Sequence, residues 1–156
     1  PLTGLYNRRY FGKRLEHEFE RTKRYNVPLS CLMLDVDKFK SINDELGHSA
    51  GDTVLVTIAE TLKETLRNVD ILARWGGEEF VIFLQAGTAN GAQLVAERIR
   101  QQVESRRHSQ LQLQVTISAG LAVADGSISF ETAIERADQA LYQAKQDGRN
   151  RVVLYS

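Results

Sequence analysis

The chain has 156 residues, of which 42% are hydrophobic, and this fits one globular domain that buries roughly two-thirds of its unfolded surface. Its 20 basic and 20 acidic side chains cancel, which excludes the strong positive field of proteins that bind nucleic acid or anionic membranes non-specifically. Cys31 lies in an apolar run. Because it is the single cysteine of the chain, an internal disulfide and a cysteine-rich zinc site are excluded as well.

The first elements predicted along the chain are a helix and a buried strand. Asn7 can cap the helix, and the Asn-Val-Pro sequence of residues 26–28 ends it. Apolar side chains recur every four residues within this helix, at Phe11, Leu15 and Phe19. The apolar run Leu29–Leu34 then predicts a buried strand.

A second amphipathic helix and a β-hairpin come next. The helix has its apolar residues at helical spacing, at Leu55, Ile58, Ala59, Leu62 and Leu66. The apolar runs Ile71–Trp75 and Phe80–Leu84 have the length and composition of strands. Gly76 and Gly77 lie between them and are typical of a tight hairpin turn with positive φ.

The last third of the chain predicts two helices and two strands. One helix has apolar residues at Ala92, Val95, Ala96, Ile99 and Val103, and the other at Phe130, Ala133, Ile134, Ala137 and Leu141. A half-buried strand is predicted from alternating apolar residues at Leu111, Leu113, Val115 and Ile117. Gly148 suits the end of the last helix, and Val152–Tyr155 form a short final strand. The order αβαββαβαβ predicts an α+β domain with one sheet and helices packed against it.

Carboxylates gather where the first strand ends and where the hairpin turns. Asp35 and Asp37 are two residues apart, so in an extended chain both point to the same face. Glu78 and Glu79 are adjacent and point to opposite faces, so only one of them can join the aspartates. Carboxylates without histidine or thiol ligands suit a hard ion such as Mg²⁺, which takes substrate phosphates as further ligands. The alternative is a strand end and a hairpin tip with solvated acids.

Four motifs together resemble the GGDEF-domain diguanylate cyclases over nearly the whole chain. In order, they read PLTGLYNRR, DVDKFKSINDELGHSAGD, RWGGEEF and AKQDGRN. The third position of the family signature is Glu78 instead of aspartate, so this is the GGEEF variant. The resemblance implies a central, mostly antiparallel sheet flanked by helices, similar to the nucleotide cyclase and polymerase palm fold. It also implies that residues 1–156 are a catalytic domain excised from a longer protein, with the regulatory region upstream.

The resemblance implies a metal site and a catalytic role for the hairpin. By it, Asp35, the carbonyl of Val36 and Glu78 bind Mg²⁺ or Mn²⁺, two ions in each active site. Glu78 or Glu79 assists as the base, and which of the two does so is left open. Lys40 is placed near the reacting phosphates.

The resemblance also assigns a GTP site. Its residues are Phe39, Lys40, Asn43, Asp52, Gly76, Gly77, Lys145 and Arg149. The carboxylate of Asp52 can accept hydrogen bonds from N1–H and the amino group of guanine, which adenine does not offer. Two alternatives stay open: Asp52 as the N-cap of the following helix, and Lys145 and Arg149 as a solvated basic helix terminus.

The resemblance also implies an inhibitory product site at Arg67 and Asp70, which form an Arg-x-x-Asp pair ahead of the hairpin, with Arg98 completing it. An arginine can clasp a phosphate or stack on a guanine, and a carboxylate can accept from the guanine edge. The alternatives are a surface ion pair for Arg67 and Asp70 and a solvated helix face for Arg98.

The implied activity is condensation of two GTP into cyclic di-GMP and two pyrophosphates. One guanine pocket per chain cannot hold both halves of the product, so we expect that catalysis needs a homodimer. A non-catalytic receptor for GTP or cyclic di-GMP is one alternative. A palm-type nucleotidyl transferase is another, but the neutral charge argues against a nucleic-acid partner. No apolar stretch approaches the ~20 residues of a membrane span, so we expect a cytoplasmic domain without direct membrane contact, even if the full-length protein is anchored elsewhere.

Overall fold

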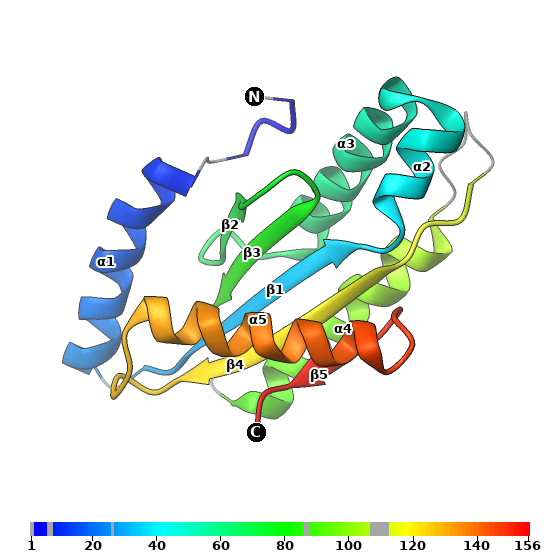
Figure 1. Cartoon of the computed structure of the whole chain (residues 1–156). Helices are drawn as coiled ribbons and strands as arrows, with labels where there is room; N and C mark the ends of the chain where they lie inside the picture. The colour runs from blue at the N-terminus through cyan, green and yellow to red at the C-terminus, as the bar shows by residue number, and fades with distance from the viewer. Residues whose placement is uncertain (1, 6–7, 26, 86–87, 107–112) are drawn as a thin grey trace.

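A five-stranded sheet forms the centre of the described structure (Figure 1). The computed structural model describes residues 2–5, 8–25, 27–85, 88–106 and 113–156. The strands are β1 (Leu29–Val36), β2 (Ile71–Arg74), β3 (Glu79–Leu84), β4 (Ile117–Ala124) and β5 (Val152–Leu154), in the spatial order β2-β3-β1-β4-β5. The β4–β5 pair is parallel and the other three pairs are antiparallel. The expected α+β fold with a mostly antiparallel sheet is therefore confirmed.

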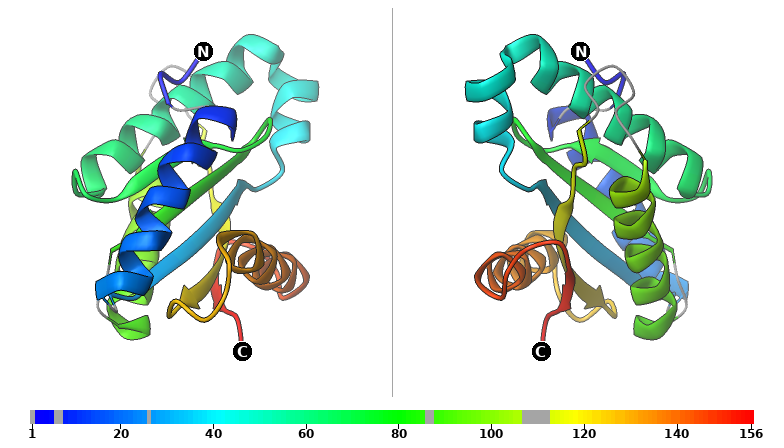
Figure 2. Two further views of the ribbon diagram at one scale, coloured as in Figure 1. Left: turned by 90° about the vertical axis from the view of Figure 1, so that its left-hand side faces the viewer. Right: turned by 90° about the vertical axis from the view of Figure 1, so that its right-hand side faces the viewer.

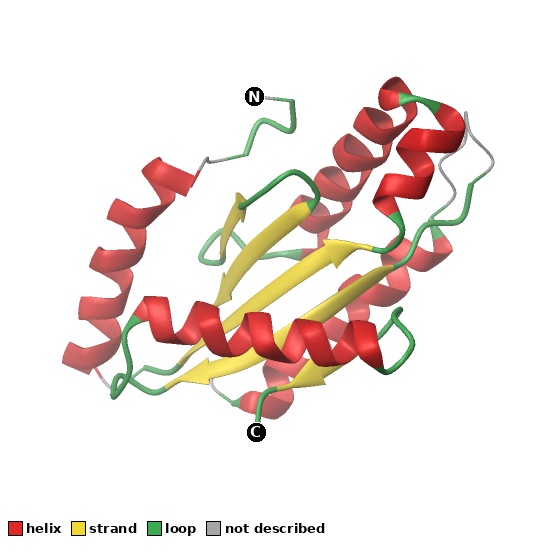
Figure 3. Cartoon of the chain, viewed as in Figure 1, coloured by secondary structure: helices red, strands yellow, loops and turns green. Residues whose placement is uncertain are grey.

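Helices cover both faces of this sheet (Figure 3). They are α1 (Arg8–Tyr25), α2 (Phe39–Leu46), α3 (His48–Thr65), α4 (Ala89–Ser105) and α5 (Phe130–Gln146). Apolar residues of α1 and α5 pack on one face, and those of α3 and α4 pack on the other. Figure 2 shows the sheet lying between α5 and α4. Among the described residues, no helix is long and apolar enough to cross a membrane.

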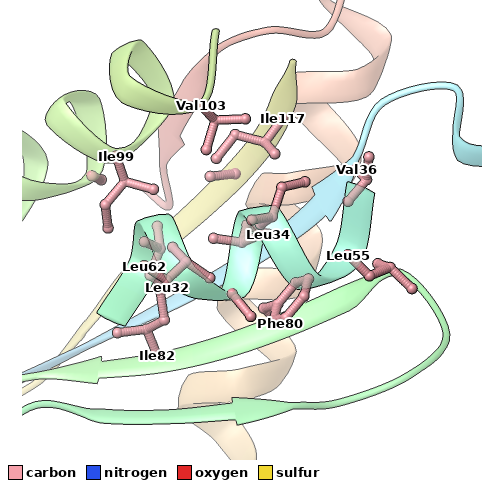
Figure 4. Packing of buried hydrophobic residues seen from close by; sticks show 14 of the residues in the cluster. Leu32, Leu34, Val36, Leu55, Leu62, Phe80, Ile82, Ile99, Val103 and Ile117 are labelled. Atoms are coloured by element: carbon pink, nitrogen blue, oxygen red, sulfur yellow. The ribbon is translucent and has the colours of Figure 1, made fainter. Parts of the chain in front are cut away.

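The central strand β1 is buried along its whole length, and its side chains alternate between the two cores. Leu32, Leu34 and Val36 face α3 and α4 (Figure 4). Cys31 and Met33 face α1 and α5, and burial raises the pKa of the Cys31 thiol. Asp35 continues this second series, which places its carboxylate at the end of the strand on the face covered by α5.

The strand β4 lies later in the chain than the alternating apolar pattern predicts. Leu111 is outside the described residues, residues 114–116 have no regular structure, and the strand begins at Ile117. The sequence of β4, ISAGLAVA, has few of the bulky residues that are typical of strands. Small residues are required there because α5 crosses it closely: a Cβ on Gly120 would lie 2.0 Å from the carbonyl oxygen of Ala137.

The segment after β1, where the sequence predicts no helix before the one that carries Leu55, contains the short helix α2. Lys38 precedes it in the left-handed conformation, with φ of 56°. Gly47, with φ of 91°, separates α2 from α3. Since α3 begins at His48, Asp52 lies inside the helix, and the alternative that it is the N-cap is wrong. The predicted cap of α1, Asn7, lies outside the described residues.

The predicted hairpin is confirmed, but its turn does not need positive φ. Four residues, 75–78, connect β2 to β3, and neither Gly76 nor Gly77 is in the left-handed region. Longer hairpin loops can be built on turns with negative φ, unlike the two-residue turns that the sequence favoured. Arg74 holds this turn by donating from Nη2 to the carbonyl of Gly77 at 2.7 Å.

Candidate active site

The candidate site lies where β1 ends, beside the β2–β3 turn and the last turn of α5. Lys145 Nζ donates to Asp35 Oδ2 at 2.5 Å, which joins two motifs that are 110 residues apart in the sequence. Asp35 is buried, with only 8% of its side chain exposed, and Lys145 is partly buried at 34%. Lys145, at the end of α5, is thus paired with a buried carboxylate, and its interpretation as a merely solvated residue of a helix terminus is wrong.

The carboxylate of Asp35 retains one oxygen without a partner. Its Oδ1 atom is buried and makes no hydrogen bond within the described structure. Glu79 lies directly opposite on β3, since the Cα atoms of Asp35 and Glu79 are register partners. Burial raises the pKa of Asp35, against the opposing effect of Lys145, and burial together with the charge of Asp35 raises the pKa of Glu79. A free buried oxygen beside a second carboxylate is the environment that a divalent cation stabilises.

The two glutamates of the hairpin have different positions, as their adjacency predicts. Glu79 pairs with Asp35, whereas Glu78 lies in the bend before β3, half-buried, and its carbonyl accepts a hydrogen bond from the amide of Val36 at 3.2 Å. The described residues contain no cluster of three or more histidine, cysteine, aspartate or glutamate side chains that could hold a metal. A bound ion therefore needs further oxygen ligands, such as a backbone carbonyl and substrate phosphates.

Helices α2 and α3 bring together the residues assigned to the nucleotide base. A Cβ on Gly51 would lie 1.9 Å from Asn43 Oδ1 and 3.1 Å from the ring of Phe39. This glycine therefore leaves the space in which Asn43 and Phe39 sit side by side. Asp52 follows Gly51 on α3 and is exposed, as is Lys40 on α2.

Arg149 lies apart from this group. It lines a hollow of about 670 Å³ together with Ser41 and Glu45 of α2. Since Asn43 contacts Gly51 on α3, Arg149 and Asn43 lie on different sides of α2. The structure thus joins Lys145 to Asp35 by a hydrogen bond and places Asn43 beside Phe39, whereas Arg149 lines the hollow on the other side of α2.

The residues assigned to the inhibitory site lie at the opposite end of the hairpin from the glutamates. The side chain of Asp70 is only 3% exposed and accepts hydrogen bonds from the amides of Arg67 at 2.9 Å and Gln85 at 3.2 Å. The guanidinium of Arg67 is exposed, lies 3.6 Å from Asp70 Oδ1 and donates to the carbonyl of Gln85. Arg98 is exposed on α4, and in the described structure it makes no hydrogen bond or ion pair with Arg67 or Asp70.

Sequence reasoning placed Asp37 beside Asp35 as a possible ligand, but its carboxylate is already satisfied. Asp37 accepts hydrogen bonds from the hydroxyl of Thr116 at 2.7 Å, the hydroxyl of Ser118 at 2.6 Å and the amide of Asn150 at 3.0 Å. The role of Asn150 was missed because its partner lies 113 residues earlier in the chain.

Comparison with known proteins identifies the fold and the motifs. The family model described as "Diguanylate cyclase, GGDEF domain" matches residues 1–151. The chain belongs to the GGDEF family. All four motifs quoted above lie within this match.

This GGDEF domain is similar to named diguanylate cyclases over most of its length. It is 44% identical to diguanylate cyclase DgcP of Pseudomonas aeruginosa over 97% of this chain and 23% of that protein. It is 48% identical to diguanylate cyclase A of Treponema denticola over 81% of this chain and 35% of that protein. The chain thus spans only 23% and 35% of the lengths of these two relatives.

A solved structure gives the same fold. The GGDEF domain of DgcB from Caulobacter crescentus, determined in complex with c-di-GMP, superimposes with a TM-score of 0.92 at 34% identity. The match covers 99% of this chain and 94% of that chain.

Proposed function

We propose that this GGDEF domain is a diguanylate cyclase that condenses two GTP into cyclic di-GMP and two pyrophosphates. The observation that carries the proposal is the arrangement around Asp35, which has a free buried oxygen, an opposing carboxylate in Glu79 and a cation in Lys145. Such a site binds the phosphates of a nucleotide through a divalent ion and a lysine together. The names of its relatives support GTP as the nucleotide.

Asp35, the carbonyl of Val36 and Glu78 would hold Mg²⁺ or Mn²⁺, and we propose two ions per site. The bound metal would neutralise phosphate charge and favour ionisation of the attacking 3′-hydroxyl. Lys145 and Lys40 would bind the β- and γ-phosphates, with Arg149 reaching them from its side of α2. Glu78 or Glu79 would accept the proton of the 3′-hydroxyl, and the raised pKa of Glu79 suits it to hold a proton.

Base recognition is assigned to α2 and α3. Asn43 and Asp52 would read the guanine edge, with Phe39 beside them and Gly76 and Gly77 leaving room for the nucleotide at the hairpin. Because Asp52 is exposed inside α3 and does not cap it, its carboxylate is free to accept from N1–H and the amino group of guanine.

Replacing Asp52 by Ala is expected to raise the KM for GTP by at least ~10-fold and to narrow the preference for GTP over ATP, because the variant loses the acceptor that only guanine uses. The melting temperature should change little, since the residue is an exposed position within a helix. Steady-state kinetics with both nucleotides check this. An unchanged GTP-to-ATP ratio would remove Asp52 from base recognition.

We further propose that catalysis needs a homodimer, because one chain supplies one guanine pocket. Specific activity is then expected to rise with domain concentration, and fusing a dimeric coiled coil before Pro1 is expected to raise it at low concentration. Initial rates measured over a range of concentrations, with the monomer fraction determined by ultracentrifugation, provide the check. Constant specific activity across a fully monomeric range contradicts the dimer requirement.

Product inhibition at Arg67, Asp70 and Arg98 is the last part of the proposal. Arg67→Ala is expected to weaken cyclic di-GMP binding at least ~10-fold and to remove the slowing of progress curves, while the initial rate on GTP stays near wild type. This variant tests the site better than Asp70→Ala, because the side chain of Asp70 also holds two backbone amides at the end of the hairpin. Calorimetry that gives equal affinities for wild type and Arg67→Ala would refute the site.

Incubation with GTP and Mg²⁺ at high domain concentration, followed by mass analysis of the products, tests the proposed function. Cyclic di-GMP with pyrophosphate is the expected result. GTP or cyclic di-GMP that binds without turnover would instead identify a receptor.

A further inference from the structure

The turn after α5, which carries Arg149, is held in a conformation that is unfavourable for its residues. Arg149 and Asn150 have φ of 66° and 46°, so two consecutive residues other than glycine adopt the left-handed region. This conformation is unfavourable for residues with a side chain because it brings Cβ close to the following carbonyl oxygen, although asparagine tolerates it better than most. Contacts from outside the turn must therefore stabilise this arrangement.

Asn150 receives contacts from two separate elements. Its amide donates to Asp37 at the end of β1, at 3.0 Å. Its side-chain oxygen accepts from Nη1 of Arg100 on α4, at 2.9 Å, and its side-chain nitrogen donates to Glu104 on the same helix. Asn150 is thus clamped between the strand that carries Asp35 and a helix on the other face of the sheet.

Arg100 is itself held rigidly. Its Nε donates to both carboxylate oxygens of Glu97, at 2.9 and 3.0 Å, and its Nη1 lies 3.6 Å from Glu104. Only 14% of its side chain is exposed. A guanidinium bound on two sides in this way has little freedom, so it fixes the position of the Asn150 amide group to which it donates.

We infer that Arg100 is a positioning residue for the phosphate-binding end of α5, acting through Asn150. By holding Asn150 in the left-handed conformation, it sets the path of the turn in which Arg149 lies. The same turn is joined to Lys145, because the amide of Gly148 donates to the carbonyl of Lys145 at 3.4 Å. The inference rests on the proposed function, because it assigns these two cations to the phosphates of GTP. Arg100 itself lies on α4, and its described contacts are with Glu97, Glu104 and Asn150 rather than with the proposed phosphate-binding residues.

The matched pair of variants is Arg100→Met and Arg106→Met. Arg106 caps the C-terminus of α4, directly after Ser105. It is also partly buried and also forms ion pairs, but these go to Glu60 and Glu64 of α3. Both variants remove one charged network of the same helix. Arg106→Met is the control for lost stability without loss of the contact to Asn150.

Arg100→Met is expected to weaken binding of a non-hydrolysable GTP analogue, measured by calorimetry with Mg²⁺, by about 10-fold, while Arg106→Met leaves it within about twofold of wild type. Arg100→Lys, which keeps the charge but lacks the fork that reaches Glu97 and Asn150 together, is expected to recover only part of the affinity. Equal losses in Arg100→Met and Arg106→Met would overturn the positioning role.

A double-mutant cycle identifies the route. In an Asn150→Ala background, Arg100→Met is expected to cause less than about twofold further loss, because the residue through which it acts is gone. Full additivity of the two losses would contradict action through Asn150.

Hydrogen exchange of the peptide covering residues 145–151 gives a readout that does not depend on activity. In Arg100→Met this peptide is expected to exchange at least about threefold faster than in wild type and in Arg106→Met. If the wild type makes no cyclic di-GMP but the exchange difference is found, the proposed function is wrong, whereas the stabilisation of the turn by Arg100 is confirmed. Unchanged exchange in an active enzyme rejects the positioning role alone.

Discussion

Replacing Asp35 by Asn is expected to lower the turnover of GTP by at least ~10²-fold while the domain stays folded. The substitution keeps the shape of the side chain but removes its negative charge. In the wild type, this charged carboxylate accepts from Lys145 with one oxygen and has the other oxygen available for a cation. Initial rates with saturating Mg²⁺ and GTP, together with circular dichroism, make the comparison. Asp125→Asn, in an exposed turn at the other end of β4, is the control and should retain wild-type turnover. Turnover near wild type in Asp35→Asn would remove this carboxylate from the mechanism.

The same assay separates the roles of the two glutamates. We expect Glu78→Gln to lower turnover at least ~10²-fold, as a metal ligand should. Glu79 lies opposite Asp35, and the two negative charges repel each other unless a cation lies between them. Glu79→Gln removes one of these two charges. If Glu79 is the base, its variant should lose turnover while keeping metal-dependent binding of a GTP analogue, whereas a variant of a metal ligand should lose both. Wild-type turnover in Glu78→Gln would contradict its assigned role as a ligand.

Gly120→Ala is expected to destabilise the fold by about 3 kcal/mol or more, at the upper end of the cost of overpacking. The added Cβ would meet the carbonyl oxygen of Ala137 at 2.0 Å and the amide nitrogen of Leu141 at 2.2 Å, both of them backbone atoms of α5. Helix and strand must therefore separate to accept even one methyl group.

Urea denaturation of Gly120→Ala and Gly12→Ala measures this effect. Gly12 lies within α1, and a Cβ there meets nothing within 4 Å, so alanine should stabilise the helix by ~0.5–1 kcal/mol. A loss below ~1 kcal/mol in Gly120→Ala would show that α5 does not pack as closely on β4 as the structure indicates.

Most of the fold was predictable because apolar periodicity is a local property of the sequence. The helices α1, α3, α4 and α5 show apolar residues at helical spacing, and β1 and the strands of the hairpin show apolar runs of strand length. The strand β4 does not, because close packing of α5 selects glycine, alanine and serine where a strand normally has bulky residues. The helix α2 was missed because it is short and because it follows Lys38, which has a positive φ. Lysine rarely adopts this conformation, so its presence in the sequence does not indicate a helix start.

The candidate site was predictable only where its residues share one motif. The spacing of Asp35 and Asp37 and the adjacency of the two glutamates follow from strand geometry, and the pairing of Asp35 with Glu79 agrees with it. Strand geometry could not show that Lys145 pairs with Asp35, that Asp37 is satisfied by hydroxyls and an amide, or that Arg100 reaches Asn150. These contacts depend on how α5 and α4 dock on the sheet, which no local pattern encodes.

The most direct measurement of the central claim is a balance of substrate and products in one reaction. The wild-type domain is incubated at high concentration with GTP and Mg²⁺, and samples are quenched over time to quantify GTP, pyrophosphate and cyclic di-GMP together. A cyclase that closes two phosphodiester bonds consumes two GTP and releases two pyrophosphates for each cyclic di-GMP. In a parallel reaction with Asp35→Asn, all three amounts should change with time at least ~10²-fold more slowly. Release of inorganic phosphate in place of pyrophosphate, or consumption of GTP without cyclic di-GMP, would contradict the assignment.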